Sequence, residues 1–243
     1  MLKFGLIGKN ISYSFSEKYF TQKFKTERIK DSSYHTFDLN TIEDFVTLAK
    51  KQKVNGYNVT IPYKEAIIPF LDSLNSKAAQ IGAVNTIKIT KNGKLKGYNT
   101  DFYGFKKSLK PLLEMHHKKA LILGTGGASK AVAYALKSLK IPYNFISRKA
   151  ENNILSYNDI TKQILDSHQI IINCTPLGTF PNIEDCPNIP YNFINSQHIL
   201  YDLIYNPEKT KFLKHGTIQG AKTKNGLEML ELQAEKSWEI WNK

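Results

Sequence analysis

Three short segments in the first half of the chain carry the side chains best suited to bind a polar small molecule. They are residues 12–16, 58–64 and 99–101, and residues 82–86 add the amide of Asn85. Together they offer hydroxyls, amides, a lysine and a carboxylate. We expect these groups at the ends of strands and helices, where α/β folds build their ligand sites.

Each of these side chains also has a purely structural interpretation. Ser14 and Glu17 form the Ser-x-x-Glu pattern of a capping box, so Ser14 is equally suited to starting a helix. Asp101 is a good N-cap residue, and Lys64 taken alone is typical of a protein surface. The prediction of a ligand site therefore depends on the combination of segments.

A glycine-rich turn at 124–131 follows an apolar run at 120–123 and opens an expected helix at 127–139. The first glycine of such a turn permits a sharp bend, and the second lets the backbone approach a pyrophosphate. The helix start then supplies N–H groups. No Gly-Lys-Ser/Thr triplet closes the turn, so it is not an NTPase phosphate loop. The predicted dinucleotide-binding residues are Gly124, Gly126, Gly127 and Ala128.

The end of the next expected strand indicates the type of dinucleotide. An NAD site usually has an acidic residue there, which binds the ribose 2′-hydroxyl. This chain has Ser147, Arg148 and Lys149 instead. A guanidinium and an ammonium suit a 2′-phosphate, so we expect NADP as the cofactor.

Short β-rich runs alternate with amphipathic helical stretches along the chain, which predicts an α/β fold with mainly parallel sheets. Strands are expected at 3–7, 34–38, 55–59, 83–90, 94–97, 119–123, 143–147, 169–173 and 198–203. Helices are expected at 16–25, 41–51, 63–70, 73–80, 102–114, 127–139 and 225–242.

The composition is that of an ordinary globular protein, with 41% hydrophobic and 23% charged residues. The net charge of +13 is spread along the chain, mostly over single lysines and pairs, which favours a solvated surface over nucleic-acid binding. No apolar run is long enough to cross a bilayer, and residues 1–8 read as a buried strand rather than a signal peptide. With only two cysteines, Cys174 and Cys186, we expect a cytoplasmic protein.

The polar segments resemble the shikimate dehydrogenase family, in the same order and at similar spacing over essentially the whole chain. The glycine turn is similar as well. So are the stretches at 172–178, 201–207 and 225–230, the last followed by Gln233. Several independent motifs in one order make chance agreement very improbable.

The resemblance implies roles in a dehydrogenase that reduces 3-dehydroshikimate to shikimate with NADPH, for aromatic amino acid synthesis. Lys64 transfers the proton, and Asp101 orients Lys64 and the substrate. The remaining substrate-binding residues are Ser14, Ser16, Thr60, Asn85, Tyr205 and Gln233. The cofactor contacts add Thr175, Leu203 and Gly226 to the glycine turn and to residues 147–149.

The chemistry of Lys64 depends on opposing influences on its charge. Pro62 suits the first position of a helix, so Lys64 is expected in the first turn, where the helix dipole disfavours an ammonium. The oxidised nicotinamide ring disfavours it as well, whereas Asp101 favours it. A lysine between these influences can act as an acid or a base near neutral pH.

Some positions depart from the family pattern. Many relatives have histidine where this chain has Tyr13, proline in place of Glu17, glycine in place of Glu228 and asparagine in place of Ser147. The paired serines, Lys64 and Asp101 are intact, so activity is expected. At position 228, the family pattern does not predict how the chain contacts the nicotinamide.

The resemblance also implies the domain organisation. A substrate domain of residues 1–100 and about 221–243 accompanies a Rossmann-type, doubly wound cofactor domain of residues 101–220. Two alternatives stay open: a quinate/shikimate dehydrogenase of broader specificity, and a non-catalytic ligand-binding regulator. The sequence is compatible with a monomer or a homodimer, and it predicts no metal, nucleic-acid or membrane partner.

Overall fold

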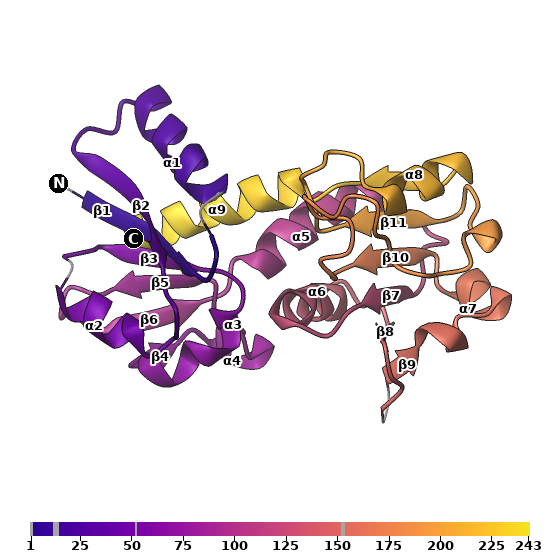
Figure 1. Ribbon diagram of the computed structural model, residues 1–243, viewed down its shortest axis with the longest axis horizontal. Helices are drawn as coiled ribbons and strands as arrows, with labels where there is room; N and C mark the ends of the chain where they lie inside the picture. Colours follow the sequence, from indigo (N-terminus) through magenta and orange to yellow (C-terminus); the bar gives the residue numbers. More distant parts are fainter. Residues whose placement is uncertain (1, 12–14, 52, 152–153) are drawn as a thin grey trace. The chain divides into compact units, whose positions relative to one another are not determined.

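The computed structural model describes residues 2–11, 15–51, 53–151 and 154–243. The chain forms two compact units. Unit 1 comprises Met1–Thr100 and Gln233–Lys243, and unit 2 comprises Asp101–Leu232. Within the described residues, each unit holds one six-stranded sheet (Figure 1). The predicted α/β fold class is confirmed.

The sheet of unit 1 is mixed. β1 pairs in parallel with β2 and β3, whereas β5 runs antiparallel to both β3 and β6, and β4 is parallel to β6. The strands, in sheet order, are β2 (Ser32–Asp38), β1 (Leu2–Gly8), β3 (Gly56–Val59), β5 (Thr86–Ile89), β6 (Leu95–Tyr98) and β4 (Ser73–Leu74).

Both faces of this sheet are buried, and successive side chains along each strand point to opposite faces. On β1, Phe4 and Leu6 join one hydrophobic cluster with α1 (Phe15–Thr26) and the end of α9 (Leu227–Asn242). Ile7 joins the opposite cluster. The helices of that second cluster are α2 (Asp44–Lys51), α3 (Tyr63–Ala66) and α4 (Ser76–Ile81).

The last turns of α9 are anchored in unit 1 by ring and polar contacts. Trp241 stacks on Phe4 with ring centroids 4.6 Å apart, and its indole N–H donates to the Ile87 carbonyl at 3.0 Å. On α1, the buried Lys23 ammonium pairs with the Glu235 carboxylate of α9 at 2.8 Å. The C-terminal helix therefore completes the core that β1 begins.

The sheet of unit 2 is parallel throughout, in the order β12, β11, β10, β7, β8, β9. One face packs on α5 (Asp101–Leu109), α6 (Gly127–Ser138) and the start of α9; the other packs on α7 (Lys162–Ser167) and α8 (Lys211–Ile218). The strands are β7 (Ala120–Leu123), β8 (Tyr143–Ser147), β9 (Ile154–Ser156), β10 (Ile170–Asn173), β11 (Ile199–Asp202) and β12 (Lys222–Lys224). A parallel sheet covered by helices on both faces is the doubly wound arrangement expected of a Rossmann-type domain.

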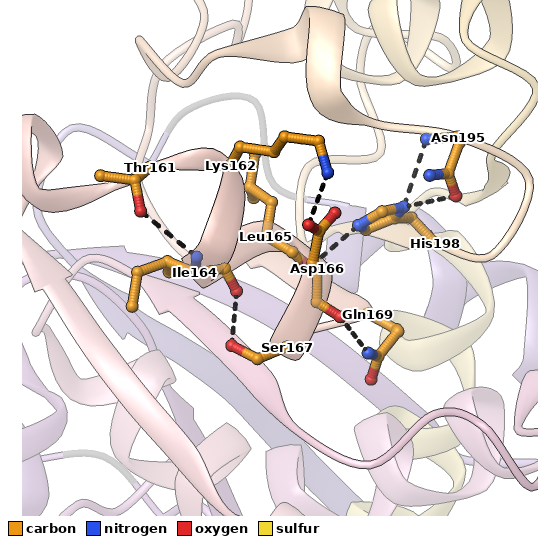
Figure 2. Close-up of polar contacts among 9 residues, drawn as sticks. All are labelled: Thr161, Lys162, Ile164, Leu165, Asp166, Ser167, Gln169, Asn195 and His198. Carbon is orange, nitrogen blue, oxygen red and sulfur yellow. Dashed lines mark hydrogen bonds and ion pairs between the residues drawn. The ribbon is translucent and has the colours of Figure 1, made fainter.

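The short helix α7 depends on polar contacts at both of its ends (Figure 2). The Thr161 hydroxyl accepts a hydrogen bond from the Ile164 N–H, which caps the first turn. At the other end, the Leu165 carbonyl lies 3.1 Å from a ring nitrogen of His198, the residue before β11. Such contacts stabilise a helix too short to persist by propensity alone.

Two expected helices end earlier than predicted, each at a proline. The stretch 63–70 divides into the one-turn helix α3 and a 3₁₀ turn at Ile68–Phe70, which contains Pro69. The helix expected at 102–114 ends at Leu109, and Pro111 lies in the 3₁₀ turn that follows. Proline lacks an N–H and disfavours helical geometry in the residue before it.

The return of the chain to unit 1 also differs from the expected position near 221. Residues Lys222–Lys224 form β12, which pairs with β11 in unit 2, and the return segment starts at Gln233 within α9. Among the described residues, no helix combines the length and apolar character needed to span a bilayer.

Candidate functional site

Thr60 and Lys64 lie just beyond the carboxyl end of β3. The Thr60 N–H donates to the Ile7 carbonyl of β1 at 2.8 Å, so Thr60 is held next to the carboxyl end of β1. Lys64 is half-buried in α3, and its carbonyl accepts a hydrogen bond from the Val84 N–H at 2.7 Å. This bond holds the backbone of Lys64 against the segment that carries Asn85.

The structure joins Asn85 directly to Gln233, which is 148 residues further along the chain. The Asn85 Nδ2 donates to Gln233 Oε1 at 3.2 Å, and the two side chains are only 3% and 7% exposed. Asn85 Oδ1 accepts the Thr100 N–H at 2.7 Å. Two buried amides linked in this way form a rigid polar surface suited to hydroxyl groups.

Asp101, which follows Thr100, is buried and is the first residue of α5. It belongs to unit 2, whereas Lys64, Asn85 and Gln233 belong to unit 1. A buried carboxylate requires hydrogen bonds or a charged partner, so Asp101 is not an exposed surface side chain.

Of the two serines predicted to bind a carboxylate, only Ser16 is described. Ser16 is buried in the first turn of α1 and hydrogen-bonds to the hydroxyl of Tyr34. Burial raises the pKa of Tyr34, with that hydrogen bond opposing the shift, so Tyr34 stays neutral. Ser14 lies outside the described residues, as does Tyr13. The carboxylate of Glu17 accepts a hydrogen bond from Thr36 at 2.6 Å.

The glycine turn of unit 2 has two distinct glycine positions. Gly124 has φ +102°, and its N–H donates to the Ile146 carbonyl at 2.8 Å, so this residue makes the bend at the end of β7. Gly126 is the N-cap of α6, and a Cβ placed on it meets no atom within 4 Å. Glycine there leaves an open approach to the N–H groups of Gly127 and Ala128, which fits a bound pyrophosphate.

The segment after β10 packs against this turn. A Cβ on Gly124 would lie 3.1 Å from the methyl group of Thr175. The Thr175 N–H and hydroxyl both donate to Asn173 Oδ1, at 3.0 and 2.7 Å. Asn173 Nδ2 donates in turn to Asp202 Oδ1 at 3.0 Å, so a buried carboxylate fixes the position of Thr175.

Leu203 and Gly226, two further predicted cofactor residues, are in close backbone contact. A Cβ on Gly226 would overlap the Leu203 carbonyl oxygen, so only glycine fits at this position. Tyr205 follows in the same loop and is half-buried, and burial raises the pKa of its hydroxyl. Gly124, Thr175 and Leu203 follow the carboxyl ends of β7, β10 and β11, three neighbouring strands of the sheet.

The residues predicted to select the dinucleotide follow β8. Ser147 ends the strand and is half-buried, whereas the side chains of Arg148 and Lys149 are exposed. An exposed guanidinium and ammonium beside a glycine turn fit a terminal phosphate group. The described residues contain no group of three or more histidine, cysteine, aspartate or glutamate side chains arranged to hold a metal ion.

Several residues that support these side chains were not among the predicted site residues. Asn58, Thr86 and Ser237 surround the Asn85–Gln233 pair, and Asp202 with Thr210 supports Asn173. Ser237 follows Gln233 by four residues, which places both on one face of α9 and was the available signal. The other contacts join distant parts of the chain.

The chain is similar to known proteins over nearly its whole length. It is 38% identical over 248 residues to the NADP(+) shikimate dehydrogenase of Clostridium botulinum strain Hall, covering 98% of this chain and 95% of the relative. The chain belongs to the shikimate dehydrogenase family. A profile of the shikimate dehydrogenase substrate binding domain matches residues 6–87, inside unit 1.

Solved structures from this family agree with the fold. Shikimate dehydrogenase 1 from Peptoclostridium difficile is 40% identical, with a TM-score of 0.88 over 100% of this chain and 92% of that one. The shikimate 5-dehydrogenase of Thermus thermophilus, solved in complex with NADP(H) and shikimate, is 28% identical, with a TM-score of 0.87 over 99% and 93%.

Proposed function

We propose that this protein catalyses the reversible, NADP-dependent oxidation of shikimate to 3-dehydroshikimate. The observation that carries this proposal is the full-length likeness to NADP(+) shikimate dehydrogenases at 38–40% identity. The buried Asn85–Gln233 pair supports it, since linked amides suit the ring hydroxyls of a polyol. The substrate roles of Ser14, Ser16, Thr60 and Tyr205 are part of the same proposal.

Oxidation of a ring hydroxyl removes a proton from oxygen and a hydride from carbon. NADP, when bound, supplies the hydride acceptor. We assign the proton to the amine of Lys64, with Asp101 orienting that group. α3 is a single turn, so its dipole is weaker than that of the longer helix expected from the sequence.

The cofactor part of the proposal uses the residues of unit 2. Gly124, Gly126, Gly127 and Ala128 receive the pyrophosphate, and Arg148 with Lys149 receives the 2′-phosphate. Thr175, Leu203 and Gly226 complete the contacts. Glu228, at the position where relatives commonly have glycine, forms an ion pair with Lys224, the last residue of β12.

The cytoplasmic location and the choice between monomer and homodimer remain predictions. Among the alternatives, a broader quinate/shikimate dehydrogenase keeps the same chemistry. A non-catalytic regulator would have no use for the buried Asp101 carboxylate and the Lys64 amine.

Reduced-nicotinamide absorbance with purified protein tests the proposal. Shikimate with NADP should give turnover, whereas quinate or NAD should give at most a small fraction of that rate. Lys64→Met should lower kcat by roughly 100- to 10,000-fold, the range of general acid–base catalysis, while NADP binding is unchanged. The exposed lysine substitution Lys50→Met serves as the control. Turnover mainly with quinate or NAD favours the first alternative, and none with either favours the regulator.

A further inference from the structure

Ser237 occupies the centre of the buried polar cluster in unit 1. It lies one turn after Gln233 in α9, and its side chain is fully buried. Its hydroxyl oxygen lies 2.8 Å from Thr86 Oγ1, 3.1 Å from Thr100 Oγ1 and 3.1 Å from Asn58 Nδ2. A buried hydroxyl with partners on three other segments organises those segments rather than merely filling space.

The direction of these hydrogen bonds follows from counting protons. Ser237 has one hydroxyl proton, and we assign it to the backbone carbonyl of Gln233, which lies 2.9 Å away and can only accept. Its oxygen therefore acts as an acceptor toward the rest of the cluster. Asn58 Nδ2 can only donate, and the Thr86 hydroxyl is the nearest other donor. The helix carbonyl thus sets the polarity of the cluster.

The same argument fixes which atom is oxygen and which is nitrogen in the side-chain amides of Asn85 and Gln233. The Thr100 N–H is only a donor, so the atom of Asn85 that it meets at 2.7 Å must be the oxygen. Asn85 Nδ2 then donates to Thr100 Oγ1 at 2.9 Å and to Gln233 at 3.2 Å. The Gln233 atom that receives this bond must therefore be Oε1.

We propose that Ser237 is a positioning residue, whose hydroxyl, through Thr86, Thr100 and Asn85, holds the Gln233 amide with its nitrogen toward the substrate. Gln233 then acts as a hydrogen-bond donor to a ring hydroxyl oxygen. This inference rests on the proposed function, since it assigns a role within that substrate site. Without the Ser237 oxygen, the hydroxyls of Thr86 and Thr100 lose a shared acceptor, and Thr100 Oγ1, which accepts from Asn85 Nδ2, is held less firmly.

The test compares Ser237→Ala with Ser108→Ala in steady-state kinetics. Ser108 is a matched control because it is also buried, with its hydroxyl 2.6 Å from that of Tyr201 inside unit 2. Ser237→Ala should raise the KM for shikimate about 3- to 10-fold, the effect of losing one hydrogen bond, with kcat and the KM for NADP within twofold. Ser108→Ala should lower Tm without changing any KM. A merely structural role of Ser237 would lower Tm and active enzyme while leaving the KM for shikimate unchanged, which would overturn the inference.

A double-mutant cycle tests whether Ser237 acts through Gln233. In the Gln233→Ala background, Ser237→Ala should cause no further rise in the KM for shikimate. Fully additive losses would contradict the relay. If Ser237→Ala does not fold, Thr86→Val removes the nearest donor while keeping the side-chain shape, and the same KM shift is expected. Failure of the wild-type enzyme to oxidise shikimate is a different result, which rejects the proposed function itself.

Discussion

The Thr210 hydroxyl donates a 2.6 Å hydrogen bond to the carboxylate of Asp202 in the interior of unit 2. The carboxylate also accepts hydrogen bonds from Asn173 and from the Ile204 N–H, at 3.0 and 3.1 Å. Burial nevertheless raises the pKa of Asp202 to about 6, because three donors offset only part of the lost hydration. The segment of Thr175 therefore depends on a carboxyl group that is hard to ionise.

This pKa predicts how stability changes with pH. A raised folded-state pKa favours the folded protein while the carboxyl is protonated, and that contribution is lost as pH rises from about 4 through about 6. The shift from 3.8 corresponds to about 3 kcal/mol. The free energy of unfolding of the wild-type protein should therefore fall by up to that amount between pH 4 and pH 7, and Asp202→Asn should not show this fall. Urea unfolding of both proteins at the two pH values measures it, and parallel pH profiles would contradict it.

Gly226→Ala should destabilise the protein. The added methyl group would overlap the carbonyl oxygen of Leu203, and backbone atoms cannot move aside as a flexible side chain can. Overpacking of this kind costs about 1–3 kcal/mol, so Tm should fall by several degrees. Differential scanning calorimetry tests this, and an unchanged Tm would show that the loop after β11 can shift.

Gly126→Ala should show the opposite pattern. A Cβ on Gly126 meets nothing within 4 Å, and φ −77° with ψ 179° suits alanine, so the loss of stability should stay within about 1 kcal/mol. The methyl group would instead occupy the approach to the start of α6. We expect NADP affinity, measured by fluorescence titration, to fall at least about tenfold, or about 1.4 kcal/mol. Unchanged affinity would argue against close backbone approach at this turn.

Arg148→Ala should change the choice of cofactor. Loss of a charge-assisted hydrogen bond to a phosphate costs about 1.5–3 kcal/mol, so the KM for NADP should rise roughly 10- to 100-fold while the KM for NAD stays within twofold. Lys149→Ala removes the neighbouring exposed cation. Comparing the two variants distinguishes a specific role of the Arg148 guanidinium from a general effect of positive charge. Equal effects on NADP and NAD would place Arg148 away from the 2′-phosphate.

The parts of the fold that local sequence patterns specify could be predicted. The uninterrupted apolar run of β7 followed by a glycine turn identified a covered parallel strand and the start of α6. The strands β4, β9 and β12 have only two or three residues each, too few for a hydrophobic period to be visible. Pro69 was the missed signal for the early end of α3.

The candidate site was predictable residue by residue but not as a network. Asn85 and Gln233 were both proposed from the family resemblance, yet their mutual hydrogen bond depends on tertiary packing across 148 positions. The supporting residues Ser237 and Asp202 contact several segments at once, and the spacing of Ser237 from Gln233 along α9 was the one local sign of such contacts. Their roles depend on hydrogen bonds that form only when these segments come together in the folded protein.

The division of the chain has a consequence for the order in which the protein is completed during synthesis. Unit 2 is one uninterrupted stretch, Asp101–Leu232, whereas unit 1 also needs Gln233–Lys243. Ribosomes make residues in order, so the parallel sheet of unit 2 has all its strands while β1 still lacks Trp241 as a partner. The earlier-made half of the molecule is thus the later one to close its core, and until then Phe4 and Phe20 lack the packing of Ala234 and Trp241.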